Sequence, residues 1–202
     1  MTAQIQDVLV FEQRPLALRS VQGTGLFDPR QQGLEPRSVS TAYYRGFDCL
    51  YRVDQKQLLL DTFRIGLNPL DRLKVKYGKG KVLQGHRPHL EGSSFLAVYE
   101  QLGWHVLFNG GLVVARGYIP GLSYRQESVV NSASSPIWMF SAVHELHFVE
   151  GLLVESFDCS SAMEVIRNRI QARVSGTHDG SWQGIHQSLM DAFRRDYPGL
   201  QW

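Results

Sequence analysis

Three times along this chain, two apolar runs of strand length stand on either side of a short turn. The paired runs cover residues 43–53 and 58–65, 104–108 and 112–119, and 138–149 and 152–157. Apolar runs around short turns are typical of β-hairpins. Asn109-Gly110-Gly111 is the strongest turn signal, because Asn and Gly tolerate the positive φ of a tight turn. The sequence therefore predicts three successive hairpins in a mainly antiparallel sheet.

The first pair of runs shows the clearest alternation. Aromatic and β-branched residues recur at every second position, which is typical of a half-buried strand. The mainly apolar face comprises Tyr43, Arg45, Phe47, Cys49, Tyr51 and Val53. Asp54-Gln55-Lys56 is the expected turn, and residues 58–65 return as the second strand.

Two amphipathic helices are expected after the last hairpin. Ser161 and Glu164 have the spacing of a capping box, which marks a helix start. Pro198-Gly199 is the expected end of the second helix. The two apolar stripes comprise Met163, Ile166, Ile170 and Val174, and Trp182, Ile185, Leu189 and Phe193. Hairpins followed by helices predict an α+β fold, with both helices packed on one face or end of the sheet.

The length of 202 residues fits a single domain, 1–202, and 43% hydrophobic residues are enough for a sizeable core. Two segments lack apolar periodicity. Residues 12–40 contain several Pro and Gly and are expected to be a long connection. Residues 66–90 are expected to be a basic loop insertion.

Charge, cysteines and hydropathy indicate a reducing, membrane-free setting. The formal net charge of +2 does not by itself point to nucleic acid or membrane. Cys49 and Cys159 are too few for a disulfide framework. No apolar run approaches the roughly 18 residues of a membrane helix, and the N-terminus lacks the features of a signal peptide. We therefore expect a cytoplasmic protein.

Histidines are the first candidates for chemistry. His144 and His147 resemble a shortened zinc-protease motif, but a spacing of three on a strand points them to opposite faces. His86 and His89 lie in an expected loop and could converge on a metal, with Glu91 as a third ligand. The set is incomplete, so we expect structural or surface histidines and no cofactor.

The sequence offers no strong nucleophile. Ser123 lacks the second glycine of a nucleophile elbow. Cys49 falls on the apolar face of a strand, where a thiol packs as a small apolar group. Cys159 lies at a strand-to-helix junction, where a helix N-terminus could lower the thiol pKa, but no base is near it in sequence. The balance leans toward a protein that is not an enzyme.

Charged residues form two candidate binding surfaces. Tyr44, Arg45, Asp48, Asp61 and Arg64 lie on the first hairpin, as the floor of a ligand pocket or as a solvent-facing ladder. The second group is basic, with no acidic residue between positions 72 and 87, and fits either a solvated loop or a site for RNA or a phosphorylated ligand. It comprises Arg72, Lys74, Lys76, Lys79, Lys81 and Arg87.

Residues 40–157 resemble a loose group of uncharacterised bacterial proteins. The shared features are Tyr44-Arg45-Gly46-Phe47, the turn through Asp54 into Leu58-Leu59-Leu60, Trp104, and Phe108-Asn109-Gly110-Gly111-Leu112. One extra residue precedes Leu112. These motifs are structural, so the resemblance implies a bacterial protein rich in hairpins and implies no activity.

We expect a protein that works by binding, with another protein as the favoured partner, in an immunity- or accessory-type role. Tyr43, Tyr44 and Arg45 are of the types enriched at interface centres. One alternative is a small hydrolase or lyase with a pocket of Arg, Asp and His residues. Another is binding of RNA or a phosphorylated ligand through residues 72–87.

Overall fold

The computed structural model describes residues 4–92, 95–120, 135–176 and 181–197. These residues form a 10-stranded sheet in the order β10-β9-β8-β2-β1-β3-β4-β6-β5, with β7 paired to β4. The strands are β1 (Val8–Phe11), β2 (Arg14–Thr24), β3 (Phe47–Asp54), β4 (Gln57–Gly66), β5 (His89–Leu90), β6 (Leu96–Tyr99), β7 (Trp104–His105), β8 (Asn109–Tyr118), β9 (Phe140–Val149) and β10 (Leu152–Asp158). The helices are α1 (Pro69–Lys76), α2 (Ser160–Val174) and α3 (Trp182–Met190), with 3₁₀ turns at Pro29–Gln32, Thr41–Tyr43 and Ile137–Met139.

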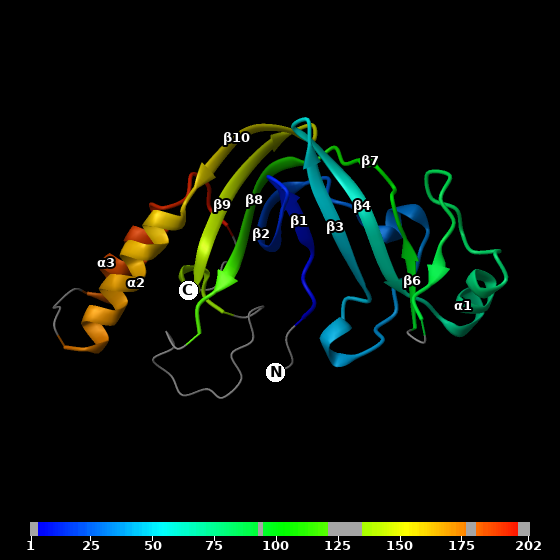
Figure 1. Cartoon of the computed structure of the whole chain (residues 1–202), viewed down its shortest axis with the longest axis horizontal. Helices are drawn as coiled ribbons and strands as arrows, with labels where there is room; N and C mark the ends of the chain where they lie inside the picture. Colours follow the sequence, from blue (N-terminus) through cyan, green and yellow to red (C-terminus); the bar gives the residue numbers. More distant parts are fainter. Residues whose placement is uncertain (1–3, 93–94, 121–134, 177–180, 198–202) are drawn as a thin grey trace.

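The sheet is strongly curved and meets itself at one end. Leu152 at the start of β10 pairs with Gln57 at the start of β4, although these strands are far apart in the strand order. Figure 1 shows the resulting arch, with the β3–β4 and β9–β10 turns close together at its top. All strand pairs are antiparallel except β1 with β3, so the expected mainly antiparallel α+β class is confirmed.

Two apolar cores lie on opposite faces of this sheet. The larger core fills the concave side and includes Phe63 of β4 and Phe148 of β9. The smaller core lies between the outer face of β8 and β9 and the helices α2 and α3. Because neighbouring strand residues point to opposite faces, Leu112 joins the first core and Val113 the second.

The structure contains two of the expected strand pairings around a turn. β3 and β4 pair antiparallel across Gln55 and Lys56, both with positive φ. β9 and β10 pair antiparallel across Glu150 and Gly151. The first strand begins later than expected, because Thr41–Tyr43 is a 3₁₀ turn and β3 starts at Phe47.

The hairpin expected at Asn109-Gly110 is wrong. Asn109 begins β8, which pairs with β2 and β9, whereas β7 pairs with β4. Gly110 serves close strand contact instead of a turn, since a Cβ there would lie 2.0 Å from the Gln22 carbonyl oxygen. Gly23 faces Gly110 in the register and has the same restriction.

The connection expected at residues 12–40 is also wrong, because most of its first half is β2. β2 forms a hairpin with β1 through Glu12 and Gln13, which adopt positive φ although neither is Gly or Asn. A register shift between Leu18 and Ser20 breaks the alternation of β2. Because β2 has neither a recognisable turn before it nor a regular apolar alternation, its sequence does not look like a strand.

Three helix expectations also need correction. α1 lies within the expected basic loop, where Asn68 caps it by accepting from the Asp71 backbone N–H at 2.9 Å. α2 begins at Ser160, so Ser161 is not its cap; the Asp158 carboxylate instead accepts from the Ser160 N–H at 2.9 Å. α3 ends at Met190, and the expected terminator 198–199 lies outside the described residues. Within the described ranges, no helix has the length and apolar character of a membrane span.

Candidate functional site

The charged residues of the first hairpin do not meet in one pocket. Asp48 is buried and accepts hydrogen bonds from Tyr43 Oη at 2.5 Å and from Arg64 Nε at 3.0 Å. Burial, helped by the Asp48 carboxylate, raises the pKa of Tyr43. Asp61 pairs instead with Arg52, with 3.0 Å between Oδ1 and Nε. These are separate pairs along the hairpin, the arrangement of a charge ladder.

Arg45 and Tyr44 lie apart from these pairs. The Arg45 guanidinium binds both carboxylate oxygens of the buried Asp7 and lies 4.2 Å from the centre of the Phe47 ring. Asp7 also accepts from the Cys49 backbone N–H at 2.8 Å, so it ties the start of β1 to β3. Tyr44 is 78% exposed.

His144 and His147 point to opposite faces of β9, as their spacing predicted. The His144 ring lies 5.8 Å from that of Phe11, a member of the concave core. The His147 ring lies 5.3 Å from that of Phe157, which packs against the outer core. One metal ion therefore cannot bind both rings.

His86 and His89 sit in different local structures. His86 closes a tight turn through backbone hydrogen bonds to Leu83, and His89 is an exposed residue of β5. In the part of the chain that the structure describes, no three His, Cys, Asp or Glu side chains gather as metal ligands would.

Both cysteines are buried away from solvent. Burial raises the pKa of Cys49 well above its ordinary value, and the nearby Asp7 carboxylate adds to this. Burial likewise raises the pKa of Cys159 to about 12, with a further contribution from Glu145. The expectation that a helix N-terminus could lower the Cys159 pKa is wrong, because desolvation of the thiolate dominates. Ser123 lies outside the described residues.

A buried polar cluster on the outer face of β9 escaped the sequence analysis. Glu145 is 0% exposed, and its carboxylate accepts from Tyr197 Oη at 2.9 Å and from the Arg194 backbone N–H at 2.8 Å. His147 Nε2 lies 2.8 Å from the same carboxylate. Because solvent does not reach Glu145, we interpret the cluster as an anchor that holds the segment after α3 against the sheet.

Helix α1 turns its apolar side toward solvent. Leu70, Leu73 and the adjoining Tyr77 are 74%, 50% and 67% exposed, whereas Val75 on the opposite side is buried. The spacing i, i+3, i+7 places the three exposed side chains in one stripe along the helix. Globular proteins normally bury such a stripe. Here its exposure shows that no described residue covers this face of α1.

Lysines border this stripe on both sides. The helical period places Lys74 on one flank and Lys76 on the other. Lys74 pairs with Asp71 at 2.7 Å, and the Lys74 hydrogen bond is the main cause that lowers the pKa of Asp71. Neither Lys76 nor Lys79 has an ion pair or hydrogen bond to another described side chain.

A positively charged pocket of about 340 Å³ adjoins the helix. Its lining combines four cations with two carboxylates: Arg37, Lys74, Lys79, Lys81, Glu35 and Asp71. The buried Val75 also lines this pocket, so the pocket opens on the other side of α1 from the stripe, and Lys74 lies between the two. We use the name α1 surface for the stripe and the lysines near it, comprising Leu70, Leu73, Lys74, Lys76, Tyr77, Lys79 and Lys81. Of the other predicted basic residues, Arg72 lies over the Phe95 ring at 4.5 Å and Arg87 donates to the Gly78 carbonyl at 2.6 Å.

No protein-family model, no curated protein and no solved structure matches the chain.

Proposed function

We propose that the protein is a binding module that docks an acidic protein partner on the α1 surface. The single observation that carries this proposal is the outward-facing stripe of Leu70, Leu73 and Tyr77 between flanking lysines. Helices that dock into grooves of other proteins present anchors with this i, i+3, i+7 spacing. The fitting partner has an apolar groove with carboxylates at its rim.

The stripe and the charges favour a protein over a nucleic acid or a membrane. An exposed apolar stripe gains nothing from a phosphate backbone, where lysines alone supply the affinity. The pocket beside α1 is recessed, which suits an inserted side chain better than a flat lipid surface. Glu35 and Asp71 in its wall would repel a doubly charged phosphate more than a single carboxylate.

This proposal agrees with an immunity- or accessory-type role, in which the protein acts by occupying its partner. The enzyme alternative loses its expected pocket, because Arg45, Asp48 and Asp61 belong to separate ion pairs. His86 and His144 lie in different elements from one another. The basic residues expected to bind RNA flank an apolar stripe, and in this proposal they contact the carboxylates of a protein partner.

The apolar contribution is tested by matched substitutions at two exposed helix positions. Leu73 in α1 and Val165 in α2 are both 50% exposed. Tagged wild type, Leu73→Asp and Val165→Asp are each used to capture partners from host lysate, with quantitative mass spectrometry as readout. We expect wild type and Val165→Asp to retain the same partner in stoichiometric amount and Leu73→Asp to lose it. Equal retention by all three would overturn the proposal.

The charge contribution is tested by reversal of Lys74 and Lys79 to Glu, with Lys56→Glu in the exposed β3–β4 turn as control. We expect only the double reversal to lose the partner at moderate salt, because charge complementarity stabilises the encounter. Heparin retention and sedimentation with anionic vesicles are measured on the same variants. Binding to heparin or vesicles that Leu73→Asp abolishes, without any protein partner, would contradict the acidic-protein proposal.

A further inference from the structure

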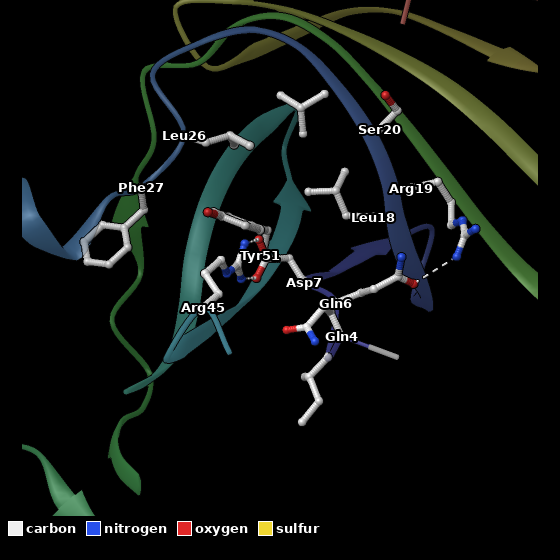
Figure 2. A pocket seen from close by; sticks show the side chains of 12 residues that line it. Gln4, Gln6, Asp7, Leu18, Arg19, Ser20, Leu26, Phe27, Arg45 and Tyr51 are labelled. Atoms are coloured by element: carbon white, nitrogen blue, oxygen red, sulfur yellow. Dashed lines mark hydrogen bonds and ion pairs between the residues drawn. The ribbon is translucent and has the colours of Figure 1, made fainter. Parts of the chain in front are cut away.

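A second cavity, of about 470 Å³, lies where β1 and β2 separate (Figure 2). β1 has four residues and β2 has eleven, and the two strands pair at only four positions. The Leu18 N–H donates to the Asp7 carbonyl at 2.8 Å and closes one end of the space. Before Asp7 the chain turns away, since the Ile5 N–H donates to the Ala42 carbonyl at 2.9 Å. The cavity is therefore a wedge between residues 4–7 and β2.

The lining of this wedge comes from both faces of the sheet. Leu18 belongs to the concave core and Val21 packs against it, because the bulge between Leu18 and Ser20 brings both to one face. The guanidinium carbon of Arg19 lies 4.7 Å from the centre of the Phe140 ring, which belongs to the outer core. All of these residues except Phe140 line the cavity. The space therefore lies in the plane of the sheet, where a further strand would run.

Beyond the wedge tip, β2 has an edge that no described strand covers. From Val21 to Thr24, the only described strand that pairs with β2 is β8. Backbone groups of a strand point alternately to its two sides, so half of the N–H and C=O groups in residues 21–24 point away from β8. In Figure 2 the blue ribbon of β2 curves around the cavity, and the green ribbon of β8 follows its far side. The cavity is thus bordered by donors and acceptors at the spacing of a strand.

This edge lacks the features that usually prevent a strand from pairing with other chains. Those features are short length, bulges, charged residues and Pro. At the two ends of the described sheet, β5 has only two residues, and β10 has a bulge between Leu153 and Glu155. Residues 21–24 of β2 read Val-Gln-Gly-Thr, without charge or Pro. This stretch is therefore open to pairing with an extended chain.

The two walls of the wedge differ in polarity. On the concave side, aromatic contacts fix Phe27 in place, since its ring lies 4.8 Å from that of Phe63 and 5.4 Å from that of Trp104. On the outer side, the Arg19 guanidinium donates to Gln6 Oε1 at 3.1 Å, so that wall is polar. A strand in the wedge would turn successive side chains to these two walls in alternation.

We infer that the wedge binds an extended peptide segment, which adds a strand along residues 21–24 of β2. Main-chain hydrogen bonds to the β2 edge supply affinity in this mode of recognition, and pockets for alternate side chains supply specificity. The fitting segment alternates apolar residues, which face Leu18 and Phe27, with polar residues, which face Arg19 and Gln6. This site is independent of the α1 surface and of the partner proposed for it.

The probes are end-blocked hexapeptides that alternate Val, Ile, Leu or Phe with Ser or Thr. The references are peptides of the same composition with the apolar residues together in one block. Fluorescence anisotropy of labelled peptides measures their affinities for the full chain. We expect the best alternating peptide to bind about tenfold or more tightly than its block-order isomer, because only alternation matches both walls. Equal affinities, or no binding by any alternating peptide, would overturn the inference.

N-methylation of the best peptide separates backbone pairing from side-chain contact. Methyl groups on two alternate amides remove donors from one edge of the extended peptide, and methyl groups on the two neighbouring amides remove donors from the other edge. We expect one isomer to lose about tenfold or more in affinity and the other to bind nearly as tightly as the parent, because only one edge faces β2. Equal binding by the two isomers would contradict strand addition.

Substitutions and hydrogen exchange locate the bound peptide. Val21→Trp fills the cavity and should abolish binding, whereas Val154→Trp on the exposed β10 edge should not. Leu73→Asp should bind the peptide normally, which separates this site from the α1 surface. In wild type, the peptide should slow amide exchange in residues 21–24 and leave exchange in residues 152–158 unchanged. Slowed exchange in β10 alone would contradict the site, even if Val21→Trp fails to fold.

Discussion

Helices α2 and α1 lie at opposite ends of the sheet and treat their apolar residues in opposite ways (Figure 1). α2 buries Met163, Ile166 and Ile170 in the outer core. α1 buries only Val75 and exposes Leu70 and Leu73. The same kind of amphipathic pattern therefore packs into the core in α2 and faces solvent in α1. Apolar spacing alone does not distinguish these outcomes.

The largest expected effect is on the α2 side. Met163 is fully buried, so Met163→Ala should lower the free energy of unfolding by about 2–5 kcal/mol. Urea denaturation measures this loss. Partner binding by the fraction that remains folded should be unchanged. A loss of unfolding free energy smaller than that of a substitution at an exposed position would contradict the packing role of α2.

The next effect concerns the anchor on the outer face of β9. Tyr197→Phe removes the hydroxyl that donates to the buried Glu145 carboxylate, which should cost about 1–2 kcal/mol of unfolding free energy. Relative to wild type, amide hydrogen exchange should also become faster in residues 191–197, while exchange in α1 should stay the same. Unchanged exchange there would show that Glu145 does not hold this segment.

A smaller, pH-dependent effect is expected where α2 begins. Hydrogen bonds to Ser160 lower the pKa of Asp158 in the folded protein. A carboxyl group shifted in this direction stabilises the fold above its unfolded pKa of about 3.9, and the stabilisation is lost as the pH falls through the folded pKa.

Asp158→Asn keeps an oxygen that can accept from the Ser160 N–H but removes the negative charge beside the N-terminus of α2. It should therefore lower the unfolding free energy by about 0.5 kcal/mol at neutral pH. The difference from wild type should shrink as the pH falls through the lowered folded pKa of Asp158, where the wild-type carboxyl also becomes protonated. Urea denaturation at neutral and acidic pH checks this, with Glu150→Gln in the exposed β9–β10 turn as the control. A difference that does not depend on pH would contradict a stabilising role of the Asp158 charge.

The smallest effect on stability is expected at α1 itself. Leu73→Ala should change the unfolding free energy by about 0.5 kcal/mol or less, because the side chain is half exposed. The same substitution should weaken partner binding. A stability loss comparable to that of Met163→Ala would mean that the stripe belongs to the fold, and the contrast between the two helices would disappear.

The sequence predicted those parts of the fold whose signals are local. The β3–β4 and β9–β10 pairings and the stripe of α2 follow from alternation, turn residues and helical spacing. β2 was missed because Glu12 and Gln13 form its turn without Gly or Asn. Gly110 does not form the predicted turn because it is needed for close approach to β2, and β2 lies far away in the sequence, at residues 14–24.

The candidate sites were predicted less well, for a related reason. The basic residues near α1 were recognised from charge alone, and Asn68-Pro69 carried a helix-start signal that was not used. The exposure of Leu70 and Leu73 depends on which elements cover α1, and the sequence pattern does not contain that. The cavity of about 470 Å³ beside Arg45 is lined by residues 4–7, 18–21, 26–27, 45 and 51, which meet only in the folded protein (Figure 2).

Lysine footprinting of the complex tests the central claim most directly. The protein, free and bound to its captured partner, is labelled with an amine-reactive reagent, and each lysine is quantified by mass spectrometry. The account predicts that Lys74, Lys76 and Lys79 lose most of their reactivity on binding while Lys56 keeps it. Equal labelling of the α1 lysines in the free and bound states, or protection confined to other surfaces, would contradict docking on the α1 surface.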